Sequence, residues 1–265
     1  MLTNISLNEK IRYKLAHSGA TIDELLKQIE EDSIELALEL YLAQGLEIVK
    51  KDNLCFYATT FLPINEAVFC VVDIETNGSN TDKHQIIEIG AKKIQGGKII
   101  DSFESLVHCD AINENITKVT GISSKDTINA PLQKEVMKSF KAFLQDSIIV
   151  AHDAKFDFKF ISSMMKRSGF EEILNRHLCS IDLAERTISA YRYGLGYLND
   201  LLCLNQEATH HRALSDATTT AELFIKALDA LDKSIITVEQ LIEFAKKAKR
   251  LKRPTFDPLR QDKLT

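Results

Sequence analysis

Five side chains in the middle of the chain have the types and spacings of a metal-dependent hydrolytic site. Asp73 and Glu75 stand two residues apart at the end of an apolar run, Asp157 follows a second apolar run, and Asp216 comes five residues after His211. Residues i and i+2 of a strand point to the same face. Carboxylates at an apolar sheet edge are costly unless a positive charge compensates them, and a hard divalent cation does so well. Two such cations about 3.5–4 Å apart form a clamp for phosphodiester cleavage.

Taken singly, each of these features has a simpler explanation. A DxE sequence after a strand is commonly a cap or a surface pair. Asp157 alone fits a helix N-terminal charge favoured by the macrodipole. A lone histidine such as His211 is more often structural, and the adjacent His210 competes for any role.

The elements needed to position these residues can be predicted from the hydrophobic pattern. We expect three strands in an antiparallel meander, a short buried strand at 147–151 and a possible strand at 178–182. The helical pattern covers four further stretches. The meander strands are expected at 67–73, 86–94 and 98–107, and the helices at 131–146, 155–167, 195–202 and 213–231. This order predicts an α/β layered domain built on a mixed sheet flanked by helices.

Three ordered motifs carry a family resemblance. VVDIETNG, IIVAHDAKFDFKF and HRALSDA, together with VTGIS at 119–123, resemble the motifs of the DnaQ-like 3′–5′ exonucleases with a DEDDh active site. The resemblance covers roughly residues 66–230 and implies a ribonuclease H-like fold.

The resemblance assigns roles by position. Asp73, Glu75, Asp157 and Asp216 match the family's ligands for two Mg²⁺ or Mn²⁺ ions, with Asp73 bridging both, and His211 matches the general base. The family's five-residue spacing selects His211 over its neighbour. The implied product is a nucleoside 5′-monophosphate released from a 3′ end. Bound cations would invert the local electrostatics of an acidic domain that cuts nucleic acid.

Weaker assignments and two departures accompany these roles. Thr76, Thr120 and His152 match positions that contact substrate. The family's usual Asn in the second motif is Asp153 here, and its second Thr in the first motif is Asn77. Neither departure touches an expected metal ligand, so substrate preference is what they put in question.

Within the family, the chain most resembles the epsilon proofreading subunits of bacterial DNA polymerase III. That resemblance implies single-stranded or frayed DNA 3′ ends as substrate and the polymerase III catalytic subunit as partner. The alternative is a stand-alone exonuclease or RNase in repair or RNA turnover. A non-catalytic scaffold is disfavoured because all five active-site residues are present.

Residues 1–65 are expected to form a small domain of three helices and a hairpin, the order of a winged helix. DNA binding is disfavoured, because the third helix carries Asp32, Glu35 and Glu39 and no Lys or Arg. A packing or partner-docking domain is the alternative. Residues 60–66 are the expected linker to an exonuclease domain at 66–232.

Residues 233–265 are expected to form a C-terminal helix and a basic tail. The last twenty residues carry a net charge of +6, against −4 for residues 1–65 and −7 for residues 66–245. We expect the tail to be extended or mobile. It is a solvated tail, a nonspecific DNA contact, or a polymerase-docking peptide anchored by Phe256 and Leu259.

The composition excludes several classes of protein. The net charge of −5 excludes a generic polyanion binder, and four prolines and ten glycines exclude low-complexity chains. No apolar run approaches the roughly 20 residues of a membrane span, and no signal peptide is visible. Five cysteines without a CxxC pair are typical of reduced thiols in a cytoplasmic protein.

Overall fold

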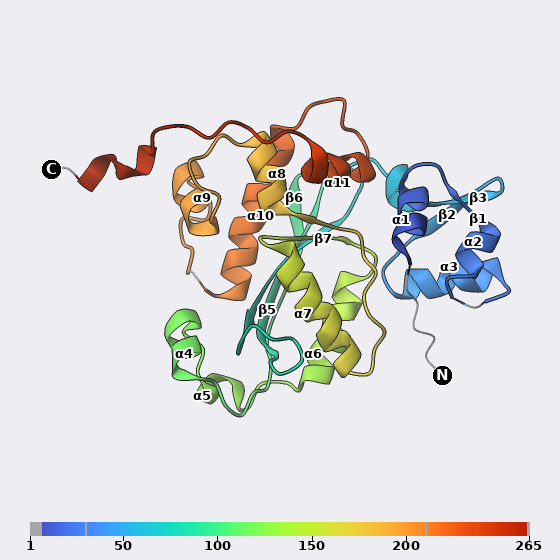
Figure 1. The fold of residues 1–265 in the computed structure, drawn as a ribbon. Helices are drawn as coiled ribbons and strands as arrows, with labels where there is room; N and C mark the ends of the chain where they lie inside the picture. Colours follow the sequence, from blue (N-terminus) through green and yellow to red (C-terminus); the bar gives the residue numbers. More distant parts are fainter. Residues whose placement is uncertain (1–6, 30, 210, 264–265) are drawn as a thin grey trace.

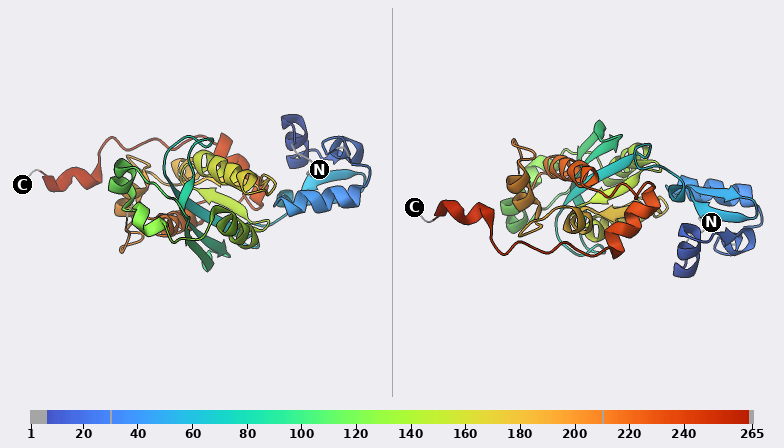
Figure 2. Two further views of the ribbon diagram at one scale, coloured as in Figure 1. Left: turned by 90° about the horizontal axis from the view of Figure 1, so that it is seen from below. Right: turned by 90° about the horizontal axis from the view of Figure 1, so that it is seen from above.

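The computed structural model describes residues 7–29, 31–209 and 211–263 and contains two sheets. Figure 1 shows a small N-terminal part beside a larger part that carries the longer strands and most of the helices. Figure 2 shows that the N-terminal part and the C-terminal tail lie at opposite ends of the molecule. Among the described residues, no helix is both long and apolar enough to span a bilayer.

The larger part is built on a five-stranded mixed sheet. Its strand order is β6-β5-β4-β7-β8, in which β4, β5 and β6 form an antiparallel meander while β7 runs parallel to β4 and β8 parallel to β7. This confirms the mixed sheet expected from the sequence. The strands are β4 (Phe69–Thr76), β5 (Ile86–Gln95), β6 (Lys98–Leu106), β7 (Ile148–Ala151) and β8 (His177–Cys179).

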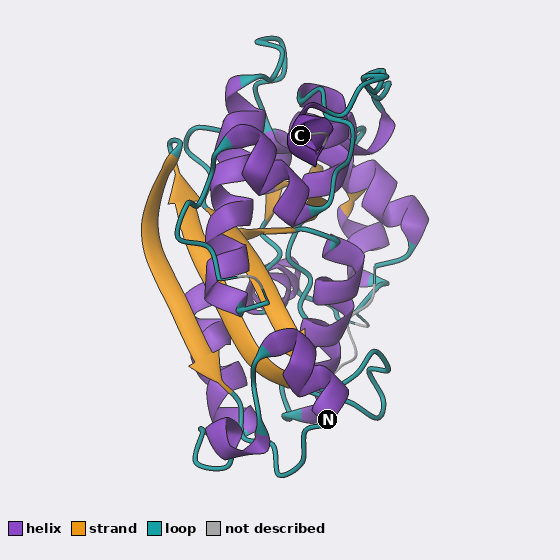
Figure 3. Ribbon diagram, turned by 90° about the vertical axis from the view of Figure 1, so that its left-hand side faces the viewer, coloured by secondary structure: helices purple, strands orange, loops and turns teal. Residues whose placement is uncertain are grey.

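Helices cover both faces of this sheet, because the buried strand β4 sends alternate side chains to each side. Phe69 and Val71 join a core with α8 (Ser180–Thr187), α9 (Leu195–Leu202), α10 (Ala213–Asp229) and α11 (Val238–Lys247). Cys70 and Val72 join a second core with α6 (Gln133–Leu144) and α7 (Ala154–Arg167). Figure 3 shows helices packed around the long strands.

Three helices of the larger part differ from the sequence prediction. Residues 178–182 were expected as a strand, but the strand ends at Cys179 and α8 begins at Ser180. Short apolar runs do not distinguish a buried strand from a buried helix. The connection between β6 and α6 also contains α4 (Glu114–Thr120) and α5 (Ser124–Thr127), which the pattern did not indicate.

The N-terminal part contains the expected three helices and hairpin, together with one short strand that was not expected. Thr21 and Glu24 form the expected capping box, with Glu24 N donating to Thr21 Oγ1 and Thr21 N to Glu24 Oε2. The winged-helix resemblance stays a prediction. The elements are α1 (Glu9–Ala16), β1 (Ala20–Thr21), α2 (Ile22–Leu26), α3 (Ile34–Ala43), β2 (Ile48–Lys51) and β3 (Leu54–Tyr57), and the sheet order is β1-β3-β2.

Polar contacts hold the N-terminal part against the larger part. The guanidinium of Arg176, just before β8, pairs with the Glu239 carboxylate of α11 and lies 4.4 Å over the Tyr57 ring. Thr59 Oγ1 donates to Glu239 Oε2 at 2.9 Å. The expected linker is also bound, since Ile64 N donates to the carbonyl of residue 236 at 2.9 Å. The N-terminal part is therefore packed directly against the larger part.

Helix α11 packs into the core of the larger part through Val238, Leu241, Ile242 and Ala245. The division of the chain at 65 and 232 stays a prediction, and this packing favours counting α11 with the preceding domain.

The tail after α11 is extended, as expected, and is also bound. Leu251 N donates to the Glu185 carbonyl at 2.8 Å, and Arg250 and Arg253 pair with the buried Glu185 carboxylate at 2.8 and 3.0 Å. Figure 1 shows the tail passing α8 and α9 before its short last helix, η2 (Pro258–Lys263). The expectation of a mobile tail therefore does not describe residues 248–257, because the buried carboxylate of α8 requires the tail's arginines.

Candidate active site

Four carboxylates converge where β4, α7 and α10 meet. Asp73 and Glu75 lie at the end of β4, Asp157 lies in the first turn of α7, and Asp216 lies in the first turn of α10. Side-chain oxygens of Glu75 and Asp216 and a ring nitrogen of His211 lie within 4.8 Å of one another. The structure therefore brings together residues from three motifs that are far apart in the sequence.

Burial, followed by the charges of neighbouring carboxylates, raises the pKa values of Asp73, Glu75 and Asp157. For Asp73, burial is the largest cause and the charges of Asp157, Asp216 and Glu75 follow, which together hold its pKa well above the usual value. Burial, followed by the charge of Asp216, raises the pKa of Glu75 to about 7. Burial, followed by the charge of Asp153, raises the pKa of Asp157 to about 8. A divalent cation with oxygen ligands would offset the repulsion among these carboxylates.

His211 lies in the turn that precedes α10. Its backbone is left-handed, with φ of 60°, and its backbone N–H donates to Asp216 Oδ2 at 3.0 Å. The side chain is exposed. The competing His210 lies outside the described residues.

A buried ion pair that the sequence reasoning missed fixes the start of α10. Glu88 is fully buried on β5, and its carboxylate accepts hydrogen bonds from Arg212 Nε at 3.1 Å and Arg212 Nη2 at 2.6 Å. The same carboxylate accepts from Ala213 N at 2.8 Å. A signal was present, because a glutamate inside an apolar strand such as IIEIGA needs a partner.

Glycine at position 90 lets α10 lie directly on β5. A Cβ at Gly90 would lie 2.2 Å from Leu214 N and 2.4 Å from the carbonyl carbon of Ala213. Both neighbours are backbone atoms, so they could not yield by a side-chain rotation. Gly90 and the Glu88 pair together set the position of the helix that carries Asp216.

Two of the three expected substrate contacts are threonines whose hydroxyls bind the chain itself. Thr76 Oγ1 donates to the Gly78 carbonyl at 2.9 Å. Thr120, which is buried, donates to the Ile116 carbonyl and accepts from Ile122 N, both at 3.0 Å. Their substrate roles stay predictions.

The third expected contact, His152, lies at the end of β7 with both ring nitrogens engaged. Nδ1 lies 2.9 Å from Ser180 Oγ, and Nε2 lies 2.9 Å from the Tyr193 carbonyl oxygen. The ring thus ties the second motif to the start of α8 and to the loop before α9. Its substrate role also stays a prediction.

The two departures from the family motifs occupy local structural positions. Asp153 precedes α7 with φ 94° and ψ 57°, a left-handed conformation that Asn and Asp both tolerate. Asn77 closes the loop after β4, since its Oδ1 accepts from Gln85 N at 2.8 Å. Asp153 keeps the backbone geometry that Asn would give and adds a charge near Asp157.

Comparisons with known proteins agree with this geometry. Residues 70–224 match the model of a family described as exonuclease. The chain is 34% identical over 168 residues to the DNA polymerase III subunit epsilon of Aquifex aeolicus, covering 63% of this chain and 83% of that protein. It is 35% identical over 201 residues to the PolC-type DNA polymerase III of Thermotoga maritima, covering 76% of this chain and 14% of that protein. It spans only 12–15% of the length of such PolC-type relatives.

Solved structures support the same assignment. Exonuclease X in complex with 5′ overhanging duplex DNA has a TM-score of 0.53 and 26% identity, over 67% of this chain and 99% of that one. E. coli Exonuclease I in complex with a dA16 oligonucleotide has a TM-score of 0.55 and 12% identity, which shows the fold alone, over 68% and 43%. Enzymes of this family generally depend on divalent metals. The mixed sheet flanked by helices, the three motifs and these relatives together show that the chain belongs to the exonuclease family with a ribonuclease H-like fold.

Proposed function

We propose that this chain is a metal-dependent 3′–5′ exonuclease that removes nucleotides from DNA 3′ ends as the proofreading subunit of a bacterial DNA polymerase III. The observation that carries the proposal is the cluster of Glu75, Asp216 and His211 atoms within 4.8 Å. Asp73 and Asp157 lie near it, since burial and, to a smaller extent, the charge of Glu75 raise the pKa of both. The epsilon subunit of Aquifex aeolicus, which the chain covers over 83% of its length, supports the polymerase assignment.

The donor set fits divalent cations. Asp73, Glu75, Asp157 and Asp216 offer only hard oxygen ligands. The raised pKa values of Asp73, Glu75 and Asp157 reflect burial and the charges of neighbouring carboxylates, and cations would offset both. When bound, two Mg²⁺ or Mn²⁺ ions would polarise the attacking water and stabilise the leaving 3′ oxygen. The carboxylates would hold the ions and, through the rigid elements that carry them, orient the scissile phosphate.

His211 is the proposed general base. Its exposed ring lies beside Glu75 and Asp216, within reach of a water at the carboxylate cluster. An imidazole accepts a proton near neutral pH, and a positioned base contributes about 10²–10⁴-fold to a rate. The proton of the attacking water would pass to the ring, and the product would be a nucleoside 5′-monophosphate.

The substrate contacts proposed for Thr76, Thr120 and His152 have a structural condition. Each side chain already hydrogen-bonds within the chain, so it would exchange or share a partner when it contacts substrate. Thr76 is the least constrained of the three, because its hydroxyl has one partner on a loop.

The proposed location of the protein is the bacterial cytoplasm, where it would be bound to a polymerase. Free thiols at all five cysteines support a reducing compartment. The proposed partner is the DNA polymerase III catalytic subunit, bound through the tail, where Phe256 and Leu259 expose 56% and 42% of their surface. Both residues follow the segment of the tail that α8 holds through Arg250 and Arg253.

The stand-alone exonuclease or RNase remains the second candidate. One comparison favours it, since the chain matches Exonuclease X over 99% of that chain's length. Co-purification with the polymerase catalytic subunit would support the first candidate. A preference for a ribo-oligonucleotide over the deoxy-oligonucleotide of the same sequence would support the second.

The proposed reaction is tested with a 5′-labelled single-stranded oligonucleotide. We expect stepwise shortening from the 3′ end that requires Mg²⁺ or Mn²⁺ and stops with EDTA. Asp216→Asn should abolish it, whereas Asp229→Asn, an exposed charge at the other end of α10, should not. Shortening that persists in EDTA or in Asp216→Asn would contradict the proposal.

A further inference from the structure

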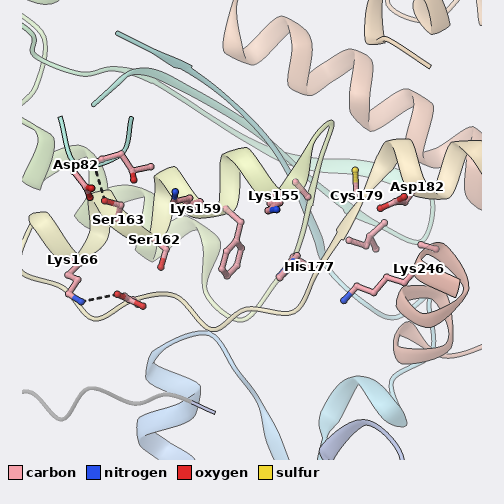
Figure 4. A pocket seen from close by; sticks show the side chains of 16 residues that line it. Asp82, Lys155, Lys159, Ser162, Ser163, Lys166, His177, Cys179, Asp182 and Lys246 are labelled. Carbon is pink, nitrogen blue, oxygen red and sulfur yellow. Dashed lines mark hydrogen bonds and ion pairs between the residues drawn. The ribbon is translucent and has the colours of Figure 1, made fainter. Parts of the chain in front are cut away.

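A groove lies on the outer side of α7, on a part of the molecule that the hydrolytic site does not use. It encloses about 700 Å³ between α7, β8 and the C-terminal end of α11. Figure 4 shows Lys155 and Lys159 on α7, with His177 and Lys246 on the opposite side of the hollow. We call it the α7 groove.

The α7 groove carries free positive charge. Lys155, Lys159 and Lys246 line it, and none of the three forms an ion pair with any residue in the described ranges. Two of the three acidic side chains that line it are partly neutralised, because Glu172 pairs with Lys166 at 3.0 Å and Asp182 lies 3.7 Å from each of two arginines. The third, Asp82, is exposed, and four lining lysines outnumber the three carboxylates. Lys155 and Lys159 belong to residues 66–245, whose net charge is −7, and Lys246 begins the basic C-terminal segment.

The floor of the α7 groove is apolar and aromatic. Phe158 and His177 face each other with ring centroids 4.4 Å apart and planes 33° apart. Burial is the largest cause that lowers the pKa of His177, to about 4, so this ring is neutral at physiological pH. Leu178 and Ala245 complete the apolar lining. The groove is therefore complementary to an anion that also carries flat apolar groups, with its charge at the lysines and the flat groups against the rings.

We propose that the α7 groove binds single-stranded nucleic acid, with phosphates at the lysines and bases against the aromatic floor. Lys155 and Lys159 lie one helical turn apart, about 6 Å along the axis, which is comparable to the separation of neighbouring phosphates in an extended strand. Positive grooves with aromatic surfaces are the usual form of sequence-independent single-strand binding. The inference rests on the proposed function, because the bound strand would be the part of the substrate that leads to the hydrolysed 3′ end.

The helix itself connects the groove to the carboxylates. Successive residues of a helix are rotated by about 100°, so Lys155, Phe156 and Asp157 lead round the first turn of α7 from the groove to the active site. Phe156 stands between the other two and is 37% exposed. Lys155 and Phe156 are both exposed, and the bound strand would pass over them toward Asp157.

An acidic peptide is the competing occupant. It would use the same lysines, but the paired rings of the floor and the continuity with Asp157 favour a nucleic acid.

The test uses a double variant with a matched control. Lys155→Ala/Lys159→Ala removes two exposed lysines at i and i+4 of α7, and Lys134→Ala/Lys138→Ala removes two at the same spacing on α6. Alanine is a strong helix former, so both variants should fold. Binding of a long 5′-fluorescein deoxythymidine oligonucleotide is measured in EDTA, where no hydrolysis occurs, so the result does not depend on activity.

Each phosphate contact contributes about −0.7 to the slope of log Kobs against log[salt] for a single strand. We expect the α7 variant to lose about 1.4 from the magnitude of the slope. Its affinity deficit should therefore be about sevenfold larger at 50 mM than at 200 mM salt. The α6 variant should match the wild type. Lys246→Ala should reduce the slope by about half as much as the α7 variant.

Equal affinities and slopes for the two double variants would overturn the proposal. The proposal would also be overturned if the lysine substitutions weakened the binding of a glutamate-rich peptide but left the affinity for the oligonucleotide unchanged. With Mg²⁺ present, the α7 variant should lose more kcat/KM on the long oligonucleotide than on a dinucleotide, which cannot reach the groove. If the wild type binds the strand as predicted but hydrolyses neither substrate, the proposed function is contradicted, whereas the proposal that the α7 groove binds nucleic acid is supported.

Discussion

Replacing Asp157 with asparagine should stabilise the metal-free protein while it destroys hydrolysis. Asp157 is 4% exposed, and burial together with the charge of Asp153 raises its pKa to about 8. Asparagine has nearly the same shape and carries no charge. Its amide oxygen can keep the hydrogen bond that the carboxyl group makes with the backbone of Ile74. The substitution therefore removes the cost of a buried charge, and its repulsion by Asp153, without opening a cavity.

The size of the effect follows from the pKa. One pKa unit corresponds to 1.36 kcal/mol, so a pKa of about 8 in the fold against 3.8 in the free residue means that Asp157 costs about 5 kcal/mol near pH 8. Neighbouring carboxylates share this cost and relax by taking up protons. We therefore expect Asp157→Asn to gain about 3 kcal/mol, or roughly 6–12 °C in Tm for a chain of this size.

Thermal unfolding in EDTA at pH 8 measures this gain, with Asp146→Asn, an exposed carboxylate before β7, as control. The control should leave Tm within about 2 °C of the wild type. Added Mg²⁺ should raise the Tm of the wild type and not that of Asp157→Asn. A lower or unchanged Tm for Asp157→Asn in EDTA would refute the view that burial and the charge of Asp153 make the Asp157 carboxylate unfavourable in the metal-free fold.

Three further outcomes are expected. Glu75 and Asp157 have pKa values of about 7 and 8 in the fold, above their unfolded values. Their contribution to the free energy of unfolding is therefore fully present below about pH 4 and is lost as the pH rises to about 8. Urea titrations in EDTA should show this decline in stability, and Mg²⁺ should make it smaller. His211→Ala should lower kcat by about 10²–10⁴-fold and should retain the stabilisation by metal. If His211→Ala kept full activity and His210→Ala lost it, the assignment of the general base to His211 would be wrong. Glu88→Gln should weaken the Arg212 pair, lowering Tm by a few degrees and kcat by about 10- to 100-fold through misplacement of α10; a lower Tm with wild-type kcat would show the pair to be only structural.

Much of the fold could be predicted from the sequence, because its signals are local. The meander of β4, β5 and β6 follows from apolar runs and a GG turn, and the predicted helix at 195–202 coincides with α9. The carboxylates of the site were identified by motif spacing, since strand ends and helix starts place them at one sheet edge.

The remaining features depend on contacts between distant residues. The Glu88–Arg212 pair joins positions 124 residues apart, and the Thr59–Glu239 bond joins positions 180 apart. In neither pair does the sequence around one residue predict which distant residue is its partner. The tail is a similar case, because its charge left several roles open, and the carboxylate that binds it, Glu185, lies in α8, far away in the sequence.

The register of β4 against β5 explains why the proposed catalytic carboxylates meet. Asp73 lies opposite Gly90, and Glu75 lies opposite Glu88. Gly90 leaves room for the backbone of α10, and Glu88 binds the residues that begin that helix. Any side chain at position 90 would have to displace α10 and Asp216 with it, and a shift of one residue would turn Asp73 and Glu75 to the opposite face of the sheet. Two strand residues without a catalytic role therefore determine where the last carboxylate stands.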